Sequence, residues 1–258
     1  MLQYEFMQNA FLAGSAIAIV AGVVGVFAVA KGETFMTHVL SEIGFAGAAF
    51  GLFAGWPPLA GMLLFNTVSS LTIGQLEAKD KRTDMITAAV SAIAIGLGVA
   101  FLTLSGKSSS GAMSIMFGSV FSLTRNDTHL LIGLSLLILV LCAALLRPLK
   151  HYAFDADTAE YTLPHFRLLG MAFTVLIATV VAISAQAVGA LLIFILVTLP
   201  AGVALRIGRS VGQMFLIAIS LALGGMWLAL LLAYWTNLPV SVYLALIEAA
   251  AYLLSLRK

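Results

Sequence analysis

The chain has 258 residues, of which 62% are hydrophobic and 9% are charged, with a formal net charge of +2. A soluble domain carries about 25% charged residues, so 13 basic and 11 acidic side chains are too few to cover a water-facing surface. The composition therefore indicates an integral membrane protein of the all-α class and gives no sign of a nucleic-acid partner.

Apolar stretches long enough to cross a bilayer follow one another along the whole chain. A hydrocarbon core of about 30 Å needs roughly 20 helical residues per crossing. The stretches lie at 10–30, 35–55, 57–76, 85–104, 129–147, 168–184, 187–205, 212–235 and 240–256. The boundary near Ser184–Gln186 is the weakest of them. The sequence predicts a polytopic helical bundle of eight or nine spans that forms one transmembrane domain over residues 1–258.

The basic residues are distributed unevenly between the two sides of this bundle. With the N-terminus outside, every Lys and Arg except Lys107 and Arg125 falls on the cytoplasmic side. Short cytoplasmic loops of membrane proteins carry such an excess of Lys and Arg. We therefore expect the N-terminus outside and the C-terminus in the cytoplasm.

The longest outer segment, residues 105–127, is rich in Gly and Ser but contains the apolar piece Met113–Phe121. Irregular backbone survives at membrane depth only where protein or a water-filled cavity covers it. We expect this segment to be re-entrant and to dip back against the bundle.

Motifs of enzymes and nucleotide-binding proteins are incomplete in this chain. The tripeptide at 106–108, Gly-Lys-Ser, resembles the end of a phosphate-binding loop, but Phe101 stands where that loop needs a glycine. The segment His38–Glu42 lacks the second histidine of a zinc-protease helix. We expect no catalytic activity and no nucleotide binding by this chain alone.

Two ionisable residues, His38 and Glu42, lie in the inner half of the second stretch. Such side chains cost on the order of 2.5–3.5 kcal/mol at mid-bilayer, so they usually face a cavity or a partner. A spacing of four leaves them about 40° apart on one helix face. An imidazole and a carboxylate there are suitable ligands for Zn²⁺, Mn²⁺ or Fe²⁺. The alternatives are that the two side chains only hydrogen-bond each other, or that they lie near the membrane interface at a helix end.

Three further polar residues lie within predicted spans and are candidates for a transport path. Glu248, midway along the last stretch, is protonated, paired with another helix, or part of the path. Asn66 and Gln186 are the other two candidates, and for both the alternative is a hydrogen bond between helices.

With these residues placed, the chain resembles the membrane permease of bacterial zinc/manganese/iron ABC importers. No single motif carries the resemblance, but their common order is specific. The matching pieces are Phe6–Gly14, Gly25–Phe27, Met36–Gly47, Asp84 after a basic loop, Phe117–Ser119, Phe154–Asp155, Gln186–Gly189, Thr198–Ala201 and Arg206–Ser210. The family's second span usually reads Asp-x-x-x-His where this chain has His38-x-x-x-Glu42, and Ala46 stands where proline is common. The two ligand types are thus present in swapped order.

The resemblance implies a multi-pass protein of the bacterial cytoplasmic membrane, surrounded by lipid. It implies a homodimer, a separate ATPase subunit that binds ATP, and an external solute-binding protein. The cargo is then a divalent metal ion, with no permanently bound cofactor. Segment 201–211, with Arg206 and Arg209, would be the coupling helix that docks on the ATPase; an ordinary basic loop is the alternative.

Two other functions fit parts of the pattern. One is a proton-coupled secondary transporter in which Glu42 and Glu248 titrate. The other is an ABC permease for a metal chelate or another small solute, because one His and one Glu per subunit do not define a metal.

Overall fold

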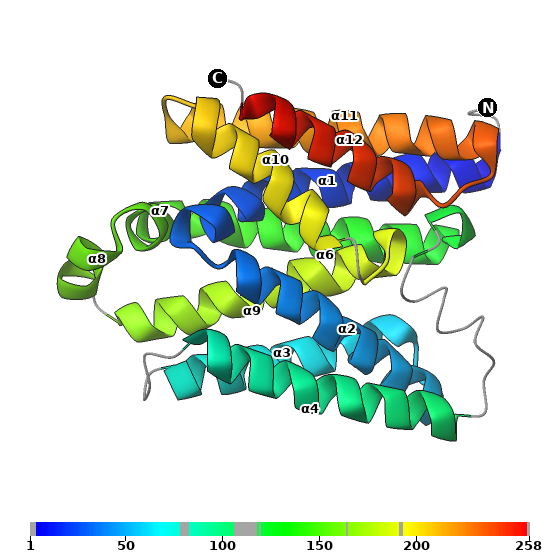
Figure 1. The fold of residues 1–258 in the computed structure, drawn as a ribbon, viewed down its shortest axis with the longest axis horizontal. Helices are drawn as coiled ribbons and strands as arrows, with labels where there is room; N and C mark the ends of the chain where they lie inside the picture. The colour runs from blue at the N-terminus through cyan, green and yellow to red at the C-terminus, as the bar shows by residue number, and fades with distance from the viewer. Residues whose placement is uncertain are drawn as a thin grey trace.

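A computed structural model of the protein describes residues 4–77, 83–105, 118, 120–163, 165–190 and 193–256. The regular elements in these ranges are all helices, and the long ones lie side by side in one bundle (Figure 1). The predicted all-α helical bundle is thereby confirmed.

Seven helices are long and apolar enough to cross a bilayer within the described part of the chain. They are α1 (Glu5–Lys31), α2 (Thr34–Ala54), α3 (Pro58–Glu77), α4 (Thr83–Leu104), α6 (Arg125–Ala144), α9 (Phe166–Val188) and α11 (Val211–Thr236). Two shorter apolar helices are α10 (Ile193–Ile207) and α12 (Val240–Ser255). Each predicted stretch overlaps one of these helices.

The expected break near Ser184–Gln186 lies inside α9, which continues to Val188. Polar Ser and Gln do not interrupt a helix whose neighbours cover it. The helix ends instead at Gly189, whose φ of 100° only glycine adopts without strain.

The two helices that follow α6 are short, α7 (Leu146–Phe154) and α8 (Ala156–Thr162). In α7 the side chains of Leu149, Tyr152 and Ala153 are buried, a spacing that places them on one helix face. The Lys31 Nζ atom lies 4.6 Å from the centre of the Tyr152 ring, which is a cation–π contact. These contacts hold α7 against the end of α1.

Several helix ends that carry basic residues meet at one end of the bundle, on the left in Figure 1. This end contains the last turns of α1 and α10 and the first turns of α7, α9 and α11. Its described basic residues are Lys31, Arg147, Lys150, Arg167, Arg206 and Arg209. Arg125, at the start of α6, lies at the opposite end.

Most of the predicted re-entrant segment, residues 106–117 and 119, lies outside the described residues. The described remainder holds Ser105, Gly118, the short helix η1 (Val120–Ser122) and the beginning of α6. The re-entrant path therefore stays a prediction. The Asn9 side chain donates a hydrogen bond of 3.3 Å to the carbonyl oxygen of Leu123 and so attaches the end of this segment to α1.

Helices α2 and α3 approach each other so closely that their contact requires glycine. A Cβ atom at Gly47 would collide with the carbonyl of Gly61, and a Cβ at Gly61 would collide with the carbonyl of Gly47. Small residues at such positions let membrane helices pack backbone to backbone. Gly47 and Gly61 thereby determine the position of α2 against α3, and α2 is the helix that carries His38 and Glu42.

We expect Gly47→Ala to destabilise the protein by about 1–3 kcal/mol, the usual cost of overpacking. Gly96→Ala on α4 is the control, because nothing lies within 4 Å of a Cβ there. Thermal unfolding of the two purified variants in detergent measures the difference. Equal midpoints for both variants would contradict the α2–α3 contact.

Candidate functional site

His38 and Glu42 occupy the first turns of α2, just after the chain turns through Gly32 and Glu33. The His38 Nε2 atom lies 3.8 Å from the Glu42 Oε1 atom, as the spacing of four predicts. The two side chains are 41% and 30% exposed. The pair therefore lies at the edge of the helix packing, where it is accessible from outside this chain.

The His38 ring packs on the Phe194 ring at the start of α10, with 4.7 Å between the centroids. Within the described ranges its Nδ1 atom is buried without a hydrogen-bond partner. The ring is thus held in place by an aromatic contact, while its Nε2 atom is directed to Glu42.

Glu42 is held by a hydroxyl from another helix. The Ser91 Oγ atom of α4 donates a hydrogen bond of 2.9 Å to the Glu42 Oε2 atom. Ser91 is only 4% exposed. Sequence reasoning did not find Ser91, because nothing local shows that α4 packs beside α2.

Among the described residues, no three His, Cys, Asp or Glu side chains gather closely enough to hold a metal ion. One chain therefore brings together an imidazole, a carboxylate and a neighbouring hydroxyl. This donor set suits a divalent cation, which still needs ligands from elsewhere.

Glu248 lies apart from this pair, on the buried face of α12. Its side chain is 1% exposed, and its Oε1 atom has no hydrogen-bond partner among the described residues. The carboxyl group lies directly against Gly225 of α11, where a Cβ atom would collide with it.

Asn66 and Gln186 lie in different surroundings. Asn66 is fully buried, and its side chain donates a hydrogen bond of 3.2 Å to the Ala178 carbonyl, which links α3 to α9. Gln186 is half-buried near the end of α9, and its Oε1 atom has no partner in the described part of the chain. Asn66 also faces α2, because a Cβ atom at Gly44 would lie 3.6 Å from its Nδ2 atom.

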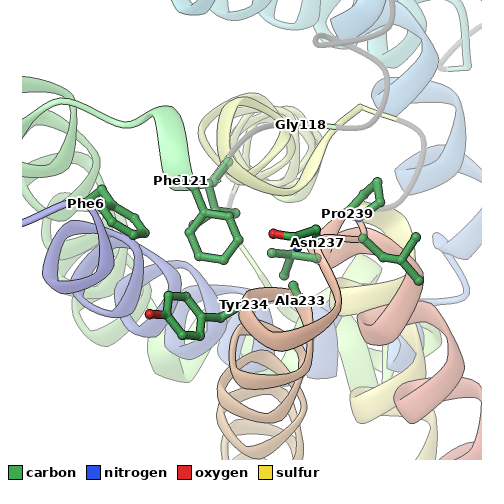
Figure 2. A pocket seen from close by; sticks show the side chains of 11 residues that line it. Phe6, Gly118, Phe121, Ala233, Tyr234, Asn237 and Pro239 are labelled. Atoms are coloured by element: carbon green, nitrogen blue, oxygen red, sulfur yellow. The ribbon is translucent and has the colours of Figure 1, made fainter. Parts of the chain in front are cut away.

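A hollow of about 470 Å³ opens at the end of the bundle opposite the basic residues. Figure 2 shows the Phe121 ring and the Asn237 side chain on facing sides of it, with Phe6 and Tyr234 at its edge. Ala187, the neighbour of Gln186, also lines it. No local pattern in the sequence indicates this hollow, because it forms only where the beginning of α1 meets the ends of α9 and α11.

Segment 201–211 is not a helix of its own. Ala201–Ile207 forms the last turns of α10, and a short turn leads to α11. Ser210 caps α11 by accepting a hydrogen bond of 3.3 Å from the Gln213 backbone N–H. Arg206 and Arg209 are exposed at this corner.

A comparison with protein-family models shows that residues 3–258 match the model described as "ABC 3 transport family". The chain belongs to the ABC 3 transport family. It is thus the membrane permease of an ABC transporter, and the ATPase is a separate subunit. This finding confirms the resemblance and argues against a secondary transporter that works alone.

Characterised relatives match over nearly their whole length. The chain is 28% identical to the manganese import system permease protein ScaB of Streptococcus parasanguinis, over 98% of this chain and 90% of the relative. It is 25% identical to the manganese transport system membrane protein MntC of Listeria innocua, over 99% of this chain and 91% of the relative.

A solved structure has the same fold. The chain superposes on a chain of PsaBC from Streptococcus pneumoniae, solved in complex with a Fab, with a TM-score of 0.88. The match covers 98% of this chain and 92% of the other, at 24% sequence identity.

Proposed function

We propose that this chain is the permease of an ATP-driven importer for manganese ions. The observation that carries the proposal is the His38–Glu42 pair, partly exposed in a membrane-spanning helix and braced by Ser91. Ionisable groups at this depth are costly unless they serve a cavity or a partner. A cation path provides such a cavity.

Manganese is compatible with the ligands and is favoured by the relatives. Carboxylate and hydroxyl oxygens suit harder cations such as Mn²⁺, whereas sites rich in imidazole or thiolate suit Zn²⁺. The pair offers one imidazole beside one carboxylate, and Cys142 is buried elsewhere, in α6. The relatives from Streptococcus parasanguinis and Listeria innocua are both described as manganese permeases.

A homodimer would complete the site. Two-fold symmetry would bring two His38 and two Glu42 side chains to one axis, enough for a four-ligand cation site. The exposed fractions of 41% and 30% leave these side chains accessible to a second copy. The dimer would also shield them from lipid.

The basic end of the bundle is proposed to face the cytoplasm, with the N-terminus outside. The corner at 201–211, with Arg206 and Arg209, would then dock on the ATPase. The hollow beside Phe121 would open outward, where a solute-binding protein delivers the ion. ATP binding would close the ATPase pair and rock the two permeases, which moves the ion between outer and inner access.

The remaining candidates are assigned to different parts of this path. Gln186 is the neighbour in sequence of Ala187, which lines the outer hollow, and would extend the proposed route. Asn66 and Glu248 are sealed between helices and join the route only when these helices part during transport.

Uptake into vesicles tests the proposal. Vesicles that contain this chain and its ATPase, with the solute-binding protein on the outer side, should take up radioactive Mn²⁺ only when ATP is supplied on the ATPase side, and uptake should persist after the proton gradient is collapsed. Uptake driven by a proton gradient in vesicles with this chain alone would overturn the ATP-driven mechanism. Uptake only of a chelated ion would overturn the free-ion cargo.

A further inference from the structure

Helix α4 carries two hydroxyl side chains one turn apart on the face that packs against α2. Thr87 and Ser91 are 1% and 4% exposed, although most of α4 faces outward. Gly98 lies on the same face, and a Cβ atom there would collide with Ala46 of α2. The hydroxyls therefore belong to the α2–α4 contact.

The two helices run in the same direction through this contact (Figure 1). Glu42 meets Ser91, and further along both helices Ala46 meets Gly98. Four residues of helix rise by about 6 Å. Thr87 precedes Ser91 by four residues, as His38 precedes Glu42, so both lie on the same side of the Ser91–Glu42 bond, toward the start of the two helices.

The Ser91 hydrogen bond fixes the carboxylate of Glu42. It occupies the Oε2 atom at 2.9 Å and leaves the Oε1 atom directed to the His38 Nε2 atom at 3.8 Å. Outer partners of this kind orient a metal ligand and set its affinity. Ser91 acts through Glu42, which makes it a positioning residue.

Thr87 is unusual among the buried threonines. Thr174 and Thr198 donate to the carbonyl four residues before them, as threonines within helices commonly do. Within the described ranges the Thr87 Oγ1 atom is buried and has no hydrogen-bond partner. Buried hydroxyls are normally bonded, so this oxygen lacks the partner that such a group usually has.

We propose that α4 forms a second wall of the ion path, with Ser91 positioning Glu42 and Thr87 supplying an oxygen ligand to the cation beside His38. The proposal rests on the proposed manganese transport and adds an oxygen donor to the imidazole and the carboxylate. Such added oxygen donors favour Mn²⁺ over Zn²⁺.

Kinetics of ATP-driven Mn²⁺ uptake by the assembled transporter test Ser91. Ser91→Ala should raise the Mn²⁺ concentration for half-maximal uptake by about tenfold or more, the usual effect of losing an outer partner, with an unchanged maximal rate per transporter. Ser91→Thr keeps the hydroxyl and should stay near the wild-type value. Ser70→Ala is the control, because the fully buried Ser70 donates only to the Thr67 carbonyl of its own helix, at 2.9 Å.

Thr87→Val keeps the side-chain shape and removes the hydroxyl. It should also raise the half-maximal Mn²⁺ concentration, and by a larger factor for Mn²⁺ than for Zn²⁺. Wild-type half-maximal Mn²⁺ concentrations for both Ser91→Ala and Thr87→Val would overturn the proposal that α4 lines the ion path, even if loss of Glu42 abolishes uptake. A fall in maximal rate alone would show a purely structural role and would overturn it as well.

Discussion

His38→Ala and Glu42→Ala should each lower manganese uptake more than about a hundredfold, because even the loss of an outer partner typically costs 10–100-fold in metal affinity. Each variant removes one ligand type from a pair whose atoms lie 3.8 Å apart. In a homodimer each substitution removes two ligands from the site, since both copies carry it. Membrane insertion should be unaffected, because both side chains lie at the edge of the packing.

Radioactive Mn²⁺ uptake, normalised to the amount of permease in the membrane, measures this effect. His151→Ala and Glu160→Ala are matched controls, because both residues lie in the short helices α7 and α8. They should transport at the wild-type rate. Unchanged uptake in both His38→Ala and Glu42→Ala would remove the site assignment.

Reversal of Arg206 and Arg209 to Glu should uncouple ATP hydrolysis from transport. The two arginines are exposed at the corner between α10 and α11. Like charges placed across an interface cost several kcal/mol, so a surface matched to two cations would reject two carboxylates. We expect uptake to fall to background while the ATPase still hydrolyses ATP.

Parallel assays of ATP hydrolysis and Mn²⁺ uptake by the same preparation test the coupling. Arg147→Glu with Arg167→Glu is the matched control, because both arginines are exposed at the same end of the bundle. This control should transport normally. Coupled turnover in the Arg206/Arg209 double variant would place the docking site elsewhere.

The helices could be predicted from the sequence because each membrane span is a local feature of the chain. Length and hydropathy define it, and glycine, proline or charges end it. The α9 boundary was misplaced because Ser184 and Gln186 are polar but do not interrupt a covered helix, whereas Gly189 does. The stretch predicted at 187–205 likewise includes the end of α9, because Gly189 rather than Ser184–Gln186 separates α9 from α10.

The candidate site was predictable only as far as it is local. His38 and Glu42 lie on one turn of one helix, so their spacing predicted their contact. The bond from Ser91 to Glu42 joins positions 49 residues apart, and the bond from Asn66 to Ala178 joins positions 112 apart. Such contacts depend on which helices are neighbours, and that arrangement is a property of the whole bundle.

The metal content of cells with and without this gene tests the central claim most directly. Elemental analysis after growth in limiting metal should show less manganese in the deletion strain, with zinc and iron unchanged. The wild-type gene should restore manganese, and the Glu42→Ala variant should not. Unchanged manganese together with a fall in zinc or iron, or full restoration by Glu42→Ala, would contradict a manganese path through His38 and Glu42.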